Sequence, residues 1–422
     1  MNQDVLILKG NIVFTPSPDQ FVVYKDSYLI SCNGIIQEIS ETLPDEFRVC
    51  NIMDYGSKLI IPGFVDLHTH ASQFNQRGLG LDLKLLEWLN EYTFKEESRF
   101  SDLAYAARVY GAFADELLRE GTTRVVVFAT IHKESCRTLV SILAGKGLGA
   151  YVGKVNMDCN CPDFLMEDTD QSLQDTEEFI RNWGDNPLVK PIITPRFAPT
   201  SSKKLLAGLG KLAKQYNLPV QSHLSENENE IKWVAELFPE QRDYYKVYEH
   251  YHLFGQTPTL MAHCVHVTDA CVAGIHQHGV MAVHCPDSNL NLASGIMPVR
   301  KLLNAGVHVG LGTDIGAGHS LSMPQAMVKA IQVSKMNNAP SCGEPLTLAE
   351  VFYMATKGGG QFFGQVGSFE QGYACDALVI DADLAPGADL SLLEKLQQFI
   401  YTGSASHIVA RYIAGKEIKI TK

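Results

Sequence analysis

Two histidines stand two positions apart at the end of an apolar, strand-like segment that runs from Pro62 to His70. Successive side chains of a β-strand point to opposite faces, so His68 and His70 project to the same side and can bind one metal ion. Such a pair also occurs in ordinary strands. The metal hypothesis therefore depends on whether further ligands follow elsewhere in the chain.

Two more candidate ligands, His223 and Asp314, each end another apolar segment. The four side chains would offer three imidazoles and one carboxylate, a donor set that suits a divalent ion such as zinc or ferrous iron. One coordination position would remain for water, and zinc can lower the pKa of a bound water to about 7. These residue types therefore predict a hydrolytic site built around an activated water molecule.

Three other ionisable residues are candidates for handling protons. Glu226 lies three positions after His223, where it can act as a general acid–base or simply favour the dipole of the first helical turn. His263 could bind the metal, donate a hydrogen bond to the water and to the developing tetrahedral centre, or be a buried structural histidine. His284 either joins the site or belongs to a turn at its rim.

These residues need a scaffold that brings the ends of distant strands together. Apolar strand-like segments alternate with amphipathic helical segments such as 102–119, 203–216 and 228–238, a pattern typical of parallel βα units. The predicted strands cover residues 65–70, 123–129, 150–157, 189–196, 220–224, 260–263, 280–284 and 307–314. Eight such units predict an α/β fold, a (β/α)8 TIM-type barrel, in which side chains at the C-terminal strand ends converge over the barrel mouth.

Both ends of the chain have the pattern of β-strands instead. The N-terminal part contains the pair Asn33-Gly34, which favours a tight hairpin, and β alternation returns near the C-terminus in residues 376–381 and 407–420. We therefore predict a small discontinuous β domain formed by residues 1–61 and 367–422, beside a barrel of residues 62–366.

The composition excludes several classes of protein. Over 422 residues the net charge is −12, which argues against nucleic-acid binding, so a nucleobase substrate would be a free base or a small derivative. No apolar run approaches the roughly 18 residues that span a membrane, and the first residues lack the pattern of a signal peptide. The ten cysteines lack the spacing of a disulfide framework. We expect a cytoplasmic protein with reduced thiols.

Longer motifs around the candidate residues resemble a known family. The segments Pro62 to His70, His223 to Glu226 and Gly312 to Asp314 are similar to those of the metal-dependent amidohydrolase superfamily. Within it the chain resembles the guanine deaminase family, through the segments His70-Ala71-Ser72-Gln73, Leu81 to Leu89, Arg196-Phe197 and His284 to Leu290. The resemblance covers essentially the whole chain.

The resemblance implies an enzyme that hydrolyses guanine to xanthine and ammonia, with one divalent metal per subunit, either Zn²⁺ or Fe²⁺. It implies that the metal ligands are His68, His70, His223 and Asp314. It also implies that Glu226 and Asp314 transfer protons and that His263 assists at the metal-bound water. Lys190 lies at the start of strand four rather than at its end, which favours one metal over a lysine-bridged pair.

The resemblance further implies a homodimer and a purine-binding pocket. The implied purine-contacting residues are Gln73, Arg196, Phe197 and Trp88. An amide and a guanidinium can pair with the polar edge of a purine, and aromatic side chains can pack on its face.

Three alternatives stay open at this point. The chain could be another amidohydrolase, acting on adenine, cytosine or a pterin. It could also be a non-catalytic scaffold that retained the fold. Residues 74–100 could form a lid that excludes water, or a segment that packs within the chain or at a dimer interface.

Overall fold

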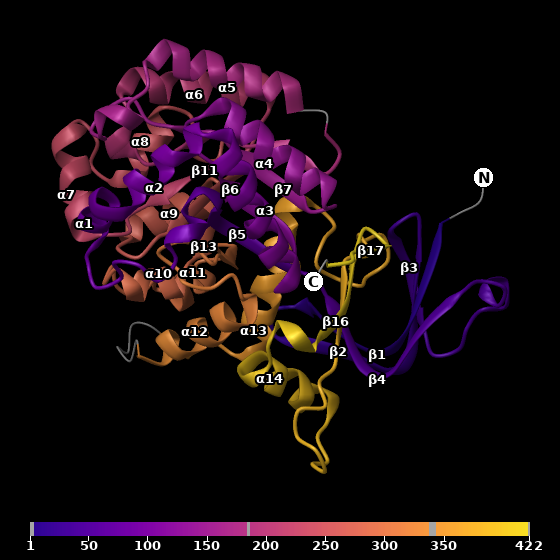
Figure 1. Cartoon of the computed structure of the whole chain (residues 1–422). Coiled ribbons are helices and arrows are strands. Elements are labelled where there is room, and N and C mark those ends of the chain that lie inside the picture. The colour runs from indigo at the N-terminus through magenta and orange to yellow at the C-terminus, as the bar shows by residue number, and fades with distance from the viewer. Residues whose placement is uncertain (1–3, 184–185, 337–342, 421–422) are drawn as a thin grey trace.

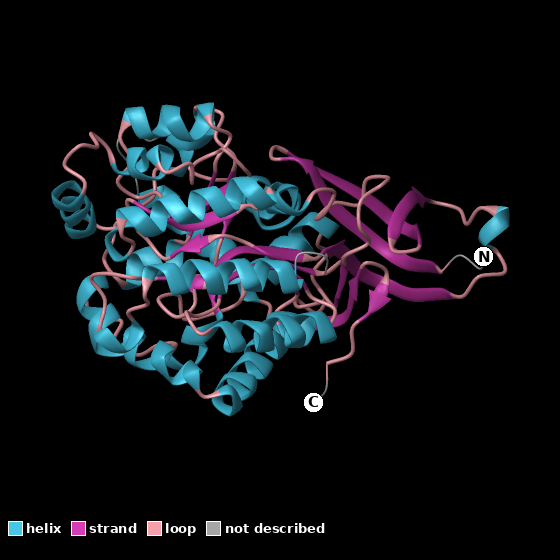
Figure 2. Cartoon of the chain, turned by 90° about the horizontal axis from the view of Figure 1, so that it is seen from above, coloured by secondary structure: helices cyan, strands magenta, loops and turns pink. Residues whose placement is uncertain are grey.

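Eight parallel strands form the predicted barrel, and helices surround it (Figures 1 and 2). A computed structural model of the protein describes residues 4–183, 186–336 and 343–420. Four strands pair in the order β5-β6-β7-β9 and four in the order β11-β12-β13-β14. A bridge between Ile193 and Val220 joins the two sets on one side. On the other side the N–H of Asp314 donates to the carbonyl of His68 at 2.8 Å, which closes the barrel.

The barrel strands lie close to the predicted segments, and a short pair, β8 with β10, extends two of them. Their bounds are β5 (Phe64–His70), β6 (Thr122–Phe128), β7 (Gly149–Gly153), β8 (Val155–Asn156), β9 (Val189–Pro191), β10 (Thr194–Pro195), β11 (Val220–Leu224), β12 (Thr259–His263), β13 (Met281–His284) and β14 (Val309–Leu311). The fold class predicted from the sequence is confirmed.

Helices cover the outside of the barrel and part of its mouth. They are α1 (Leu85–Trp88), α2 (Phe94–Ser98), α3 (Leu103–Arg119), α4 (Lys133–Gly145), α5 (Thr169–Trp183), α6 (Lys203–Tyr216), α7 (Glu228–Leu237), α8 (Tyr244–His250), α9 (Asp269–Gln277), α10 (Pro286–Asn291), α11 (Val299–Asn304), α12 (Met323–Met336), α13 (Leu348–Tyr353) and α14 (Leu392–Thr402). The side chains of Asp102 and Ser202 cap α3 and α6 by accepting hydrogen bonds from backbone N–H groups of the first turn. These caps fix the start of α3 one residue after the predicted start and that of α6 at the predicted residue.

The two ends of the chain share one seven-stranded sheet, in the order β17-β16-β15-β4-β1-β2-β3. Figure 1 shows the indigo and yellow strands side by side at one end of the molecule. The sheet comprises β1 (Val5–Ser17), β2 (Gln20–Cys32), β3 (Ile35–Ser40), β4 (Ile52–Pro62), β15 (Ala377–Ile380), β16 (Ile408–Ile413) and β17 (Lys416–Glu417). The β2–β3 turn has positive φ at both Asn33 (52°) and Gly34 (78°), as a tight hairpin requires. The domain boundaries at 61/62 and 366/367 stay a prediction.

A buried ion pair ties this sheet to the barrel. Arg124, on β6, donates from Nε to Asp376 Oδ2 at 2.6 Å and from Nη2 to Oδ1 at 3.0 Å. Asp376 lies just before β15, and its Oδ1 also accepts from the N–H of Ala414. A bidentate ion pair of this kind fixes both the position and the orientation of the two side chains. It therefore holds the terminal sheet against β6.

Helix α14 was not predicted from the sequence. It begins with a capping box formed by Ser391 and Glu394, and it buries Leu396, Phe399 and Ile400. In the described part of the chain no helix is long and apolar enough to cross a membrane. The nine cysteines within that part are free thiols, and Cys342 lies outside the described residues.

Candidate active site

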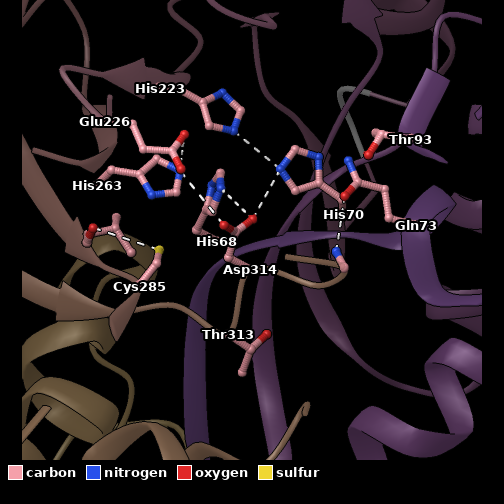
Figure 3. A network of polar contacts seen from close by, with 12 residues as sticks. His68, His70, Gln73, Thr93, His223, Glu226, His263, Cys285, Thr313 and Asp314 are labelled. Carbon is pink, nitrogen blue, oxygen red and sulfur yellow. Dashed lines mark hydrogen bonds and ion pairs between the residues drawn. The ribbon is translucent and has the colours of Figure 1, made fainter. Parts of the chain in front are cut away.

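The four candidate metal ligands converge at the mouth of the barrel. His68 and His70 end β5, His223 lies on β11, and Asp314 follows β14 (Figure 3). Asp314 Oδ1 lies 3.2 Å from His68 Nε2 and 3.4 Å from His70 Nε2. His70 Nε2 lies 3.3 Å from His223 Nε2. Strands far apart in sequence thus bring all four donor atoms together.

These separations fit a single tetrahedral ion. Two nitrogen or oxygen ligands at the usual distance from zinc lie about 3.3 Å apart in a tetrahedral site. The buried Nε2 of His68 has no hydrogen-bond partner among the described residues, and the Nε2 atoms of His70 and His223 face each other. A cation between these nitrogens would bind all three lone pairs. The donor set therefore fits a divalent metal.

The protonation states of the ligands also suit a metal. Burial lowers the pKa of His68 to about 4 and that of His223 well below the usual value, so both imidazoles are neutral near pH 7. His223 Nδ1 donates to the carbonyl of Arg196 at 2.6 Å, which leaves its Nε2 as the lone-pair donor. Burial alone would raise the pKa of Asp314, but His68 and its other histidine neighbours hold that pKa well below the usual value. Asp314 is thus a carboxylate.

Asp66, which was not predicted as a site residue, holds the backbone around Asp314. Its Oδ1 accepts from the N–H of Thr313 at 3.0 Å and from the N–H of His68 at 3.2 Å, and its Oδ2 accepts from the hydroxyl of Thr313. Burial raises the pKa of Asp66 to about 7. One carboxyl group therefore connects the strands that carry His68 and Asp314.

Replacing Asp66 by Ala is expected to weaken metal binding without removing a ligand. Residues that orient metal ligands typically contribute about 10-fold to 100-fold in metal affinity. We expect the dissociation constant for Zn²⁺, measured by competition with a chromogenic chelator, to rise within that range. The matched control is Asp54→Ala, at an exposed position of the terminal sheet, for which we expect the wild-type constant.

Glu226 and His263 lie on the opposite side of this cluster from Gln73 (Figure 3). Ser294 Oγ donates to Glu226 Oε1 at 3.0 Å, whereas Glu226 Oε2 lies 3.6 Å from His263 Nε2. His263 Nε2 is also 3.8 Å from Asp314 Oδ2. The N–H of Glu226 donates to Glu230 Oε2, so the start of α7 holds its backbone in place. The carboxyl groups of Glu226 and Asp314 therefore flank the imidazole of His263.

Burial raises the pKa of Glu226 to about 7, so this carboxyl group can gain or lose a proton near neutral pH. Burial alone would lower the pKa of His263, but the nearby Glu226 and Asp314 raise it above the usual value. His263 Nδ1 donates to Asn289 Oδ1 at 2.9 Å, which leaves Nε2 directed at the cluster. Glu226 and His263 can therefore transfer protons beside the metal ligands.

The backbone is left-handed at two of these strand ends. φ is 73° at His263 and 48° at Asp314, although neither residue is glycine. Such conformations typically cost about 1–3 kcal/mol each and cluster at functional sites. Here both residues belong to the cluster at the barrel mouth.

A pocket of about 400 Å³, which includes its open mouth, lies directly over the cluster. Its walls carry all four predicted purine-contacting side chains. The lining residues are His70, Gln73, Leu85, Trp88, Leu89, Arg196, Phe197, His223, Glu226, His263, Leu292, Asp314 and Ala317. The pocket is thus polar at the cluster and at Gln73 and Arg196, and its other lining residues are apolar, as a small planar heterocycle requires.

The segment 74–100 forms one wall of this pocket. Its Trp88 and Leu89 line the pocket, and Trp88 Nε1 donates to the carbonyl of Leu79 at 3.0 Å. Trp88, Leu89 and Phe94 pack in one apolar cluster with Phe197. The segment therefore packs over the mouth in this structure, and its opening as a lid stays a prediction.

His284 lies outside this pocket. It ends β13, but its imidazole lines a separate cavity with Met297 and Arg300, and neither ring nitrogen has a partner among the described residues. Burial lowers its pKa to about 3. The strand-end position that suggested a role for His284 does not place it in the site.

Sequence reasoning also missed three residues that hold the predicted ones. Asn289 accepts from His263, Ser294 donates to Glu226, and Glu97 binds both Gln73 and Arg196. Asn289 stands in the His-Cys-Pro-Asp-Ser-Asn motif and Glu97 in an acidic pair, yet neither motif indicates which side chain is buried. Their partners become visible only when distant strands are placed side by side.

The fold and the site define a class of proteins. A sequence profile of the Amidohydrolase family matches residues 59–418, which cover the barrel and the C-terminal strands. The chain belongs to the amidohydrolase family.

Comparison with individual proteins narrows this class. A solved guanine deaminase from C. acetobutylicum with bound guanine is 50% identical, with a TM-score of 0.97 over 99% of this chain and 100% of that chain. Guanine deaminase from Dictyostelium discoideum is 38% identical over 99% of both chains, and that from Homo sapiens is 36% identical over 98% of this chain and 96% of its own. Within the family, the chain falls among the guanine deaminases.

Proposed function

We propose that this protein hydrolyses guanine to xanthine and ammonia. One observation carries the proposal: four candidate metal ligands, a buried carboxylic acid and a pocket for a planar heterocycle share one chamber at the barrel mouth. The chain is also 50% identical to a guanine deaminase solved with guanine in its active site.

The proposal includes one divalent metal ion per chain, either Zn²⁺ or Fe²⁺. The residues that would hold it are His68, His70, His223 and Asp314. The ion would supply a water molecule whose pKa is lowered far enough to make hydroxide available at neutral pH.

Guanine would lie across the pocket between the metal ligands and the side of the pocket formed by Gln73 and Arg196. The amide of Gln73 and the guanidinium of Arg196 pair with its polar edge, and Phe197 and Trp88 pack against the ring. This placement brings C2 close to the attacking water and keeps bulk water out. Orientation of this kind lowers the entropic part of the activation free energy.

The residues of this chain then move the protons. Asp314 accepts one proton from the water, and protonated Glu226 donates to the ring nitrogen beside C2 as the water oxygen adds to C2. His263 donates a hydrogen bond to that oxygen. Glu226 next takes the proton of the new hydroxyl group, and Asp314 returns its proton to the amino group as the C2–N bond breaks. One proton thus ends on the ring and the other on ammonia.

The experiment that tests this function measures ammonia release from free bases. Purified protein is given guanine, adenine, cytosine and a pterin in turn, and the product is identified by its ultraviolet spectrum. We expect guanine to be turned over fastest, with xanthine formed in equal amount to ammonia. Faster release from another base would identify a different deaminase, and no release from any base would indicate a non-catalytic scaffold.

Replacing Arg196 by Ala is expected to impair guanine use more than metal binding. The guanidinium lines the pocket but offers no lone pair, because all its nitrogens are donors. Loss of a charge-assisted hydrogen bond predicts a fall in kcat/KM of about 10-fold to 100-fold, with wild-type metal content. Steady-state kinetics and elemental analysis of the same sample measure both. An unchanged kcat/KM would mean that the pocket is misassigned.

We also propose that the protein acts in the cytoplasm in purine breakdown, as a homodimer that binds neither nucleic acid nor membrane. A net charge of −12 supports the part of the proposal that concerns nucleic acid. Sedimentation velocity at micromolar concentration tests the oligomeric state, with twice the mass of one chain as the expected result.

A further inference from the structure

One carboxylate lies directly behind the two polar side chains at the far end of the pocket. Glu97, on α2, is 3% exposed and is not among the residues that line the pocket. Its Oε1 accepts from Gln73 Nε2 at 2.8 Å, and its Oε2 accepts from Arg196 Nη1 at 2.5 Å. Each oxygen of Glu97 thus holds a different pocket residue.

These contacts determine which hydrogen-bonding groups face a ligand. Gln73 Oε1 accepts from the N–H of Gly316 at 3.0 Å, so both ends of the Gln73 amide have a defined orientation. The guanidinium of Arg196 lies 5.3 Å from the centre of the Phe94 ring, which restricts it further. The donors left for a ligand are the second amide hydrogen of Gln73 and the other N–H groups of Arg196.

The same contacts set the charge of this end of the pocket. The negative charge of Glu97 balances the positive charge of Arg196. The other titratable side chains that line the pocket are His70, His223, Glu226, His263 and Asp314, and all of them belong to the metal-ligand end. A neutral purine therefore meets a neutral, donor-rich surface, whereas a purine anion gains no net attraction there.

We propose that Glu97 is a positioning residue that orients Gln73 and Arg196 and neutralises the guanidinium, so that the pocket favours neutral guanine over anionic xanthine. This inference rests on the proposed function. Xanthine is a stronger acid than guanine and is partly anionic in mildly alkaline solution. A neutral recognition surface would therefore help the product to leave.

Three variants of the full-length, metal-loaded protein separate orientation from charge. Glu97→Gln keeps the size of the side chain, but the NH2 group that replaces one carboxylate oxygen cannot accept from the donor it faces, and the charge is lost. Glu97→Asp keeps the charge but shortens the reach. The matched control is Glu96→Gln, the neighbouring carboxylate, which is 9% exposed and binds Tyr105 and Arg99 instead.

Kinetics with guanine and product inhibition by xanthine give the readouts. We expect Glu97→Gln and Glu97→Asp each to raise the KM for guanine by about 10-fold or more, with kcat changed much less, and Glu96→Gln to match the wild type. Inhibition by xanthine should weaken with rising pH in the wild type and in Glu97→Asp. In Glu97→Gln this weakening should be lost, because the guanidinium is no longer balanced.

The outcomes distinguish this inference from the proposed function. If the wild type does not turn over guanine, both are overturned. If the wild type is active but Glu97→Gln has the KM and the pH trend of Glu96→Gln, only the role of Glu97 is overturned. Thermal melting checks folding. If Glu97→Gln does not fold, Glu97→Asp decides: a raised KM supports the role, and a wild-type KM overturns it.

Discussion

Replacing Glu226 by Gln is expected to lower kcat for guanine by about 10²-fold or more while the protein keeps its metal. General acid–base groups typically contribute about 10²-fold to 10⁴-fold, and an amide can neither donate an acidic proton nor take one up. Glu226 Oε1 is already held by Ser294, so the amide oxygen can keep this contact and the fold should persist. Stopped-assay kinetics with elemental analysis of the same preparation measure the effect.

The control for Glu226→Gln tests the alternative that a glutamate here only supports the start of a helix. Glu228 is exposed and lies in the first turn of α7, so Glu228→Gln changes the same charge at the same helix end. Its interaction with the helix dipole is typically about 0.3–1 kcal/mol, and it lies outside the pocket lining. We expect wild-type kcat for Glu228→Gln. Equal activity of both variants would remove the proposed role of Glu226.

Replacing His68 by Ala is expected to remove metal and activity together. His68 Nε2 is buried, lacks a hydrogen-bond partner and lies 3.2 Å from Asp314 Oδ1, as expected of a metal ligand. Loss of His68 also leaves only three of the four proposed ligands. We expect less than about a tenth of the wild-type metal after dialysis, and guanine turnover reduced in proportion.

The matched control for His68→Ala is His284→Ala. Both histidines are buried at barrel strand ends, but His284 lines a separate cavity. Its ring nitrogens have no partners in the described structure, so truncation breaks no hydrogen bond. We expect His284→Ala to keep its metal. A His68→Ala protein that retained full metal occupancy would mean that His68 is not a ligand.

The barrel could be predicted because its signal is local and repeated. The predicted segment 220–224 coincides with β11, and 203–216 coincides with α6. The spacing of apolar residues in both segments, and the serine that caps α6, can be read from the sequence. Helix α14 was missed although its signal is local too: the capping box of Ser391 and Glu394 precedes apolar residues at helical spacing, Leu392, Leu396, Phe399 and Ile400. The seven-stranded sheet needed an inference across the whole chain, since β15 pairs with β4 although more than 300 residues separate them.

The candidate ligands could be predicted for a different reason. Barrel topology brings every strand end to one rim, so the residue types at those ends suffice to suggest His68, His223 and Asp314. Residues that act through others carry no such signal. Asp66 looks like an ordinary polar residue within a strand until its bonds to Thr313 appear, and Glu97 looks like a surface glutamate until Arg196 is placed against it. Sequence position does not encode which face of a helix is buried by a distant strand.

The most direct test of the central claim is a titration of metal against activity. The wild-type protein is stripped with a chelator, reloaded with known amounts of Zn²⁺, and assayed for guanine turnover at each step. The proposed site predicts that activity is absent in the stripped protein, rises linearly, and reaches its maximum at one ion per chain. Full turnover by the metal-free protein, or a maximum only at two ions per chain, would contradict it.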